Sequence, residues 1–188
     1  MRLLGKSAVL GAVAALAVGT SPVQAQVGLT SSLATVTINA TKSSVLSLLI
    51  NSGGTQNLAS LTDNATNSFA SPVNVTTTWD LNAGSNVVLV GSFGTPAQAL
   101  ASGTNYITSS LVKGRVTTGT PTSFTAFTQN GVGTVGTAGG SLTLFTQSTA
   151  PLAGNRTDNL DLQIDLTGQP NLLPGTYTGT LNLQAIVQ

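Results

Sequence analysis

Apolar and polar side chains alternate along most of residues 159–188, which read NLDLQIDLTGQPNLLPGTYTGTLNLQAIVQ. The alternation covers residues 160–166 and, farther along, residues 177–187. A period of two places successive side chains on opposite faces of a β-sheet, so that one face packs on a core and the other faces water. Two glycines and two prolines lie between the two stretches, within residues 168–175, and such residues set or free φ at turns. The pattern predicts two long strands joined by a turn.

Shorter segments of the same kind recur along the rest of the sequence. The further predicted strands are residues 34–40, 45–50, 73–81, 87–93, 106–107, 111–117, 123–128 and 141–147. Residues 45–50 are apolar on both faces and therefore predict a buried strand, whereas residues 96–102 predict a single helical turn. Gly, Pro and Asn separate the segments at intervals of about 8–12 residues, which is typical of a sandwich. We expect an all-β fold, a single antiparallel β-sandwich of about nine or ten strands, in preference to a transmembrane barrel, because the aromatic residues do not recur at strand ends.

The first 25 residues have the pattern of a secretory signal peptide. Arg2 and Lys6 are basic, residues 8–18 form a run of small apolar side chains, and a Val-Gln-Ala triplet at the end resembles a cleavage site. The apolar run is shorter than the roughly 18 residues that a membrane span needs. We therefore expect residues 26–188 to form one exported domain without a transmembrane segment, located in the periplasm, at the cell surface or outside the cell.

The charge inventory bears on the partners of such a domain. Without Arg2 and Lys6 the chain has four basic and five acidic side chains, so it presents no basic surface for nucleic acid or for anionic membranes. Only two lysines remain, although sheet proteins that stay monomeric usually place Lys, Pro or bulges on their edge strands. Long alternating strands with so few charges favour self-association, by strand addition or by less ordered stacking. A monomer with covered edges is the alternative.

The residue inventory also argues against an enzyme. The chain has no His, Cys or Glu, which excludes Ser-His-Asp and Cys-His nucleophile systems, ordinary zinc sites and disulfides. Asp161 and Asp165 share one face of a predicted strand, but four residues at roughly 3.4 Å each separate them by about 14 Å. The paired carboxylates of glycosidases lie about 5–9.5 Å apart. We therefore expect no catalytic residues, no cofactor and no metal centre of these kinds.

Three other motifs have both a functional and a structural interpretation. Oxygen ligands cluster at residues 155–161, near a predicted loop, where Asp158 would help to bind a calcium ion or would instead hydrogen-bond the local backbone. Residues 131–136 fit the GxGxxG pattern, but no helix follows them, so they predict a hairpin loop rather than a pyrophosphate site. Trp79 and Tyr106 would provide stacking surfaces for a glycan if they were exposed, although the register of Trp79 with apolar positions of its strand favours the core.

Residues 173–187, LPGTYTGTLNLQAIV, resemble the closing hairpin of bacterial immunoglobulin-like pilin and spore-coat-U-type surface domains, which often end in a Pro-Gly-Thr-Tyr turn and a final alternating strand. The resemblance implies an immunoglobulin-like sandwich and an exported subunit that passes through the periplasm with a chaperone. It also implies that each subunit joins its neighbour by donating an N-terminal strand. The disulfide and the C-terminal aromatic residue that many such pilins contain are absent here.

The resemblance assigns two sets of apolar residues to assembly. Those of the leading segment would form the donor arm, namely Val27, Leu29 and Leu33. Those of the last strand would form the accepting edge, namely Leu181, Leu183, Ala185 and Val187. We expect an exported, non-catalytic structural protein, a pilin-like or coat-like cell-surface subunit that associates with itself or with other surface subunits. The alternative is a monomeric extracellular or cell-wall glycan-binding module that uses Trp79 or Tyr106.

Overall fold

The structure is a computed structural model that describes residue 32 and residues 34–188 of the chain. It divides into two units, Met1–Ala40 and Thr41–Gln188, and the strands described below all belong to the second unit. The predicted signal peptide, residues 1–25, lies outside the described residues. In the part of the chain that is described, no helix is long and apolar enough to cross a bilayer.

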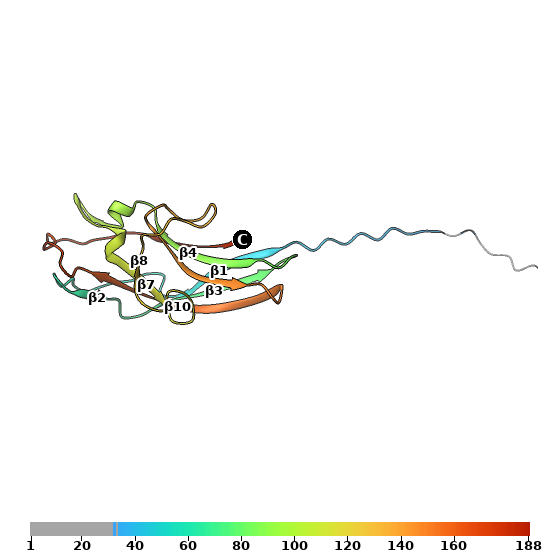
Figure 1. Cartoon of the computed structure of the whole chain (residues 1–188), viewed down its shortest axis with the longest axis horizontal. Helices are drawn as coiled ribbons and strands as arrows, with labels where there is room; N and C mark the ends of the chain where they lie inside the picture. The colour runs from blue at the N-terminus through green and yellow to red at the C-terminus, as the bar shows by residue number, and fades with distance from the viewer. Residues whose placement is uncertain (1–31, 33) are drawn as a thin grey trace, which may run out of the picture. The chain divides into compact units, whose positions relative to one another are not determined.

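The unit Thr41–Gln188 is a sandwich of two antiparallel sheets with an additional small hairpin (Figure 1). Its strands in chain order are β1 (Val45–Ser52), β2 (Thr66–Ser68), β3 (Val73–Asp80), β4 (Asn86–Phe93), β5 (Leu100–Ser102), β6 (Asn105–Ile107), β7 (Val112–Val116), β8 (Thr125–Ala126), β9 (Ser141–Ser148), β10 (Ala153–Asp165) and β11 (Leu181–Val187). The larger sheet has the order β1-β3-β10-β7-β8, with β2 also paired to β10, and the smaller sheet has the order β11-β4-β9. β5 and β6 form the hairpin, and two short 3-10 turns, η1 (Pro96–Gln98) and η2 (Ser109–Leu111), precede β5 and β7.

The predicted all-β sandwich is confirmed, and the described residues form eleven strands in place of the nine or ten expected. β3, β4 and β9 lie where the sequence predicts them. Of residues 96–102, predicted as a helical turn, the first three form η1 and the last three form β5. β10 is longer than predicted and begins at Ala153, because residues 153–160 pair with the whole length of β3. Residues 155–159, which the sequence places near a loop before the predicted strand, therefore lie within that strand.

Two predictions about the start of the fold are wrong. Residues 34–40 form no strand despite their alternation, because no described strand pairs with them. β1 is an edge strand rather than a buried one: among the described strands it pairs with β3 alone, and its Val45, Leu49 and Ile50 side chains are exposed. Apolar composition on both faces therefore corresponds here to an accessible edge rather than to burial.

The core lies between the two sheets and consists mainly of inward side chains of β3, β4, β9 and β10. Phe127 is fully buried and packs edge-on against Phe93 of β4, with the ring centroids 5.2 Å apart. Trp79 of β3 is also in the core, with 6% of its surface exposed. Opposite it on β10 is Gly154, where a Cβ would lie 2.9 Å from Cζ2 of Trp79, so the missing side chain makes room for the indole.

Candidate functional site

β11 forms one edge of the smaller sheet. It pairs along its length with β4, and no other described strand pairs with its second side. Asn86, the first residue of β4, and Gln188, the residue directly after β11, form a hydrogen-bonded pair. The N–H of Gln188 donates to the carbonyl oxygen of Asn86 at 2.8 Å, and the N–H of Asn86 donates to that of Gln188 at 2.7 Å. Hydrogen-bonded and non-hydrogen-bonded pairs alternate in an antiparallel ladder. The residues whose backbone N–H and C=O groups point to the free side of β11 are therefore Leu181, Leu183, Ala185 and Val187.

The side chains of these same four residues pack on the core but are only partly buried. The inward side chains of β4 beside them, such as Val87 and Leu89, are completely buried. On the other face of β11, Ile186 packs against a second apolar cluster that includes Val88 and Val90. The unpaired side of β11 thus leaves accessible apolar surface that an additional strand would cover.

β1 of the larger sheet lies close to β11, with Cα atoms of the two strands within 8 Å of each other. Its core-facing Leu46 and Leu48 are also only partly buried. Where the start of β1 meets the end of β11, a cavity of about 380 Å³ is lined by Leu46, Leu81 and Val187 together with neighbouring residues. We refer to β11 and the facing strand β1 as the open edge of the sandwich.

The described residues that precede the sandwich contain a second accessible apolar row. Residues 34–40, sequence ATVTINA, alternate apolar side chains with Thr and Asn. Val36 and Ile38 are 84% and 87% exposed. Outside the described residues lies the donor arm that the sequence assigns, namely Val27, Leu29 and Leu33. The alternation of residues 34–40 is the same as that of a strand of the sandwich. What differs is that these residues are not paired with any described strand.

Cations of β7 bind two carboxylates of β10. Asp161 accepts a hydrogen bond from Nε of Arg115 at 2.9 Å, and Asp165 accepts one from Nζ of Lys113 at 2.6 Å. Arg115 stands directly opposite Asp161 in the register, and Lys113 is diagonal to Asp165. Each carboxylate therefore has a cation of its own rather than facing the other carboxylate.

The hydrogen bond from Lys113 holds the pKa of Asp165 well below its ordinary value of 3.8, and hydrogen bonds from Thr167 act in the same direction. The unfolded chain, with an ordinary pKa, binds a proton at higher pH than the folded chain does. The stabilisation by ionised Asp165 is complete above about pH 5 and declines as the pH falls through 3.8 and below. We expect the unfolding temperature of Asp165→Asn to fall less steeply with decreasing pH than that of the unchanged chain. At neutral pH the substitution should lower the free energy of unfolding by at most about 1 kcal/mol. Parallel acid limbs for the two chains, measured by circular dichroism, would contradict this expectation.

Asp158 is a buried carboxylate with donors on both oxygens. It accepts hydrogen bonds from Nε and Nη2 of Arg156, at 2.7 and 2.5 Å, and from Oγ1 of Thr118 at 2.7 Å. The guanidinium of Arg156 also lies 4.1 Å from the centre of the Phe145 ring, within the range of a cation–π contact. The Arg156–Asp158 pair is therefore part of the packed interior.

The oxygen ligands that the sequence offers around Asp158 for a calcium ion do not converge on one point. Residues 155–161 belong to a strand, in which successive side chains point to opposite faces, so Asp158 and its immediate neighbours do not converge. The oxygens of Asp158 already accept hydrogen bonds from Arg156 and Thr118. Among the described residues there is no group of three or more acidic side chains that could hold a metal ion.

The remaining positions that the sequence singles out are Trp79, Tyr106 and residues 131–136. Trp79 is buried and presents no stacking surface, whereas Tyr106 of β6 is 41% exposed. Residues 131–136 form a tight loop in which Val132 and Val135 exchange backbone hydrogen bonds, in agreement with the hairpin interpretation.

Comparisons of this chain with protein-family models, with curated proteins and with solved structures find no match. The geometry of the open edge and the exposed row at residues 34–40 are therefore the basis for inferring a function.

Proposed function

We propose that this chain is an exported, non-catalytic structural protein, a pilin-like or coat-like cell-surface subunit that assembles by strand addition. In this proposal an alternating apolar segment near the start of one copy pairs with the free side of β11 in the next copy. One observation supports it above all others. The inward side chains of β11 are partly exposed along an edge without a described partner strand, while Val36 and Ile38 are exposed on a segment of matching period.

The free side of β11 offers the two components that strand addition needs. Backbone groups of alternate residues are available for a hydrogen-bonded ladder, and the inward side chains form an apolar floor. An added strand with a period of two would place its apolar side chains on this floor and its polar side chains in water. Burial of Val36 and Ile38 would contribute about 1.5–3 kcal/mol each.

Insertion between the strands of the open edge also requires β1 to move. A strand hydrogen-bonded to both β11 and β1 would hold them about 9–10 Å apart, twice the spacing of neighbouring strands. Their Cα atoms come within 8 Å of each other. Among the described strands β1 is paired only with β3. Because β1 and β11 share no ladder, a shift of β1 away from β11 breaks no backbone hydrogen bonds between them.

The proposed donor arm includes more than the sequence assigns. Val27, Leu29 and Leu33 remain its sequence-based part. Residues 34–40 add a longer uninterrupted alternation directly before the sandwich in the sequence, and their apolar side chains are exposed. We therefore include residues 34–40 in the donor arm.

Export and partners are inferred from the sequence. The signal-like residues 1–25 and the resemblance of residues 173–187 to pilin-type hairpins support passage through the periplasm and assembly at the cell surface or outside the cell. A periplasmic chaperone would protect the apolar open edge until another subunit covers it. The absence of His, Cys and Glu supports a non-catalytic role without a cofactor.

The alternative, a monomeric glycan-binding module built on Trp79 or Tyr106, has less support. Trp79 is in the core and only Tyr106 has an accessible ring. A single exposed aromatic side chain at 41% exposure is common on protein surfaces and does not by itself indicate a ligand.

The molar mass in solution tests the proposal. We expect residues 26–188 to give a ladder of multiples by light scattering after chromatography, because the free side of β11 can bind one further copy at each step. The share of multiples should rise with concentration, and electron microscopy should show regular filaments in the early fractions. A sharp, folded monomer at every concentration would contradict self-assembly.

A further inference from the structure

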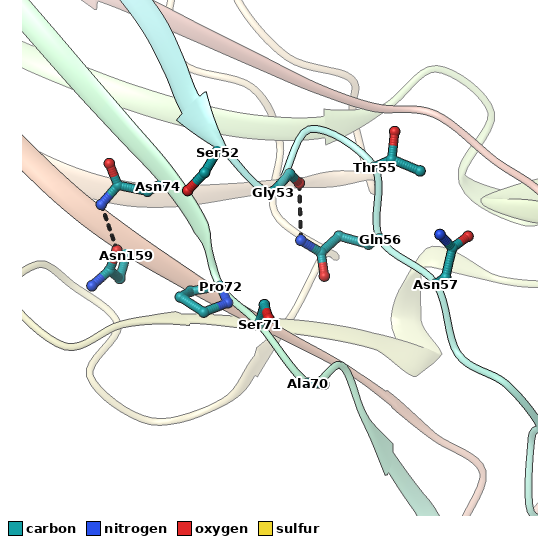
Figure 2. Close-up of a pocket in the computed structure, with 10 residues that line it drawn as sticks. All are labelled: Ser52, Gly53, Thr55, Gln56, Asn57, Ala70, Ser71, Pro72, Asn74 and Asn159. Carbon is teal, nitrogen blue, oxygen red and sulfur yellow. Dashed lines mark hydrogen bonds between the residues drawn. The ribbon is translucent and has the colours of Figure 1, made fainter.

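A polar cavity of about 530 Å³ lies where β1 ends and β3 begins (Figure 2). Segments that are far apart in the sequence meet there: the loop of residues 52–57, residues 70–72, β3 and β10. Its volume is within the range of about 300–1,000 Å³ that is usual for small-molecule sites. It lies at the end of β1, at Ser52, whereas the cavity of the open edge lies at the start of β1, and no residue of β11 lines it.

One wall of the cavity is a loop with a constrained backbone. Gly53 has a φ of +74°, a left-handed conformation that favours glycine. A Cβ at this position would collide with the carbonyl oxygen of Pro72. Gln56 closes the loop by donating from Nε2 to the carbonyl oxygen of Gly53 at 2.9 Å (Figure 2). The glycine thus lets the loop pack directly on Pro72 and fixes this side of the cavity.

Amide side chains of the sheet form the opposite wall. Asn51 donates from Nδ2 to Oδ1 of Asn74 at 2.7 Å, and Asn74 donates from Nδ2 to Oδ1 of Asn159 at 2.6 Å. This relay orients Asn159 and leaves its Nδ2 group as a donor. Within the described chain, neither Nδ2 of Asn159 nor the side-chain amide of Asn57 has a hydrogen-bond partner. The cavity is therefore bounded by a constrained loop and by the sheet, and it presents two exposed amide groups that have no partner in the described chain.

The chemistry of the lining selects among ligands. The lining side chains are amides, hydroxyls and small apolar groups, with no charged and no aromatic side chain among them. A carboxamide carries a donor and an acceptor side by side, which matches two neighbouring hydroxyls of a sugar ring. An ionic ligand would lose hydration in this cavity without a charge to compensate for it. The lining fits a neutral, hydroxyl-rich molecule.

We propose that this cavity binds an uncharged saccharide unit through the side chains of Asn57 and Asn159. Neutral hydrogen bonds without aromatic stacking are consistent with a dissociation constant on the order of 1 mM for one unit. Repetition of the site along an assembly would raise the effective affinity for a polysaccharide. Only this last consequence rests on the proposed self-assembly; binding of a single unit does not.

Saturation-transfer difference NMR on the full chain tests the site, because it observes the ligand whether the protein is a monomer or an assembly. The probes are glucose, galactose, N-acetylglucosamine and their neutral oligosaccharides, with glucuronate as the charged comparison. We expect transfer to at least one neutral sugar and weaker transfer to glucuronate. Asn57→Ala and Asn159→Ala should each reduce the transfer severalfold.

Asn155→Ala is the matched control, because Asn155 lies on the same face of β10 as Asn159 and does not line the cavity. It should bind as the unchanged chain does. Asn57 is exposed and its side chain makes no described hydrogen bond, so Asn57→Ala should keep the fold. This variant therefore tests the site even if Asn159→Ala is unstable. Tighter binding of an oligosaccharide than of its single sugar would identify a polysaccharide as the ligand, and equal binding would identify a free sugar.

Three outcomes would overturn the site: no transfer to any neutral probe at tens of millimolar, undiminished transfer in both asparagine variants, or transfer that is lost in Tyr106→Ala instead. Light scattering on the same samples separates this proposal from the proposed function. A monomer that binds sugar through Asn57 supports the site and contradicts assembly. An assembling chain without transfer overturns the site alone.

Discussion

Replacement of Val36 and Ile38 together by aspartate should convert an assembling chain into a monomer. Both side chains are more than four-fifths exposed, so the variant should retain its fold. In the assembly the two positions would face the apolar floor of β11, where an ionised carboxylate has no partner and desolvation costs several kcal/mol. A cost of about 3 kcal/mol already weakens association about a hundredfold. Light scattering after chromatography measures the change.

Thr35 and Thr37 provide the matched control for this prediction. Thr35→Asp with Thr37→Asp places the same two charges on the same segment, but at positions of the opposite parity. In an added strand these side chains would point to water, so assembly should persist. If both double variants are monomeric, charge repulsion rather than a buried row explains the loss. If the Val36 and Ile38 variant still assembles, residues 34–40 are not the inserted strand.

The accepting side offers an independent check of the same prediction. The backbone N–H of Ala185 points to the free side of β11, so Ala185→Pro removes a donor for an added strand and none that β4 uses. We expect this variant to stay folded and to assemble poorly. Assembly at the level of the unchanged chain would place the contact elsewhere than on β11.

The alternation of side chains predicts much of this fold because it is a local property. It locates β3, β4, β9 and β11, and its parity correctly gives the inward row of β11. The edge position of β11 and β1 is not local, because it depends on which strands pair. This is why residues 45–50 read as a buried strand and residues 34–40 as a member of the sandwich.

The two features that the sequence does not reveal both depend on contacts between distant segments. Asn57 and Asn159 both line the polar cavity, and nothing in either local sequence marks a ligand. The Arg156–Asp158 pair has the same residue types as the half-buried pair Arg115–Asp161, and the packing of Phe145 and Thr118 distinguishes it. Burial, rather than residue type, separates the two pairs.

Arg156→Met should lower the free energy of unfolding by about 3–5 kcal/mol, because it leaves the buried Asp158 carboxylate without its cation. The side chain of Asp158 is 1% exposed and that of Arg156 is 17% exposed, so water cannot replace the lost partner. Such a loss is a large part of the roughly 5–15 kcal/mol that stabilises an ordinary domain. Urea unfolding followed by circular dichroism measures it.

Arg115→Met is the matched control, since Arg115 also pairs with an aspartate of β10 and also lies over an aromatic ring, that of Phe124 at 4.5 Å. Its side chain is 40% exposed and that of Asp161 is 29% exposed, so its loss should cost about 0–1 kcal/mol. Arg156→Met with Asp158→Leu should recover most of the stability, because it removes the stranded charge as well. Equal losses in the two single variants would show that the Arg156–Asp158 pair is solvated in solution. A double variant no more stable than Arg156→Met would assign the loss to the other contacts of Arg156 rather than to charge, namely its packing on Phe145 and its hydrogen bonds to Thr118 and Gln147.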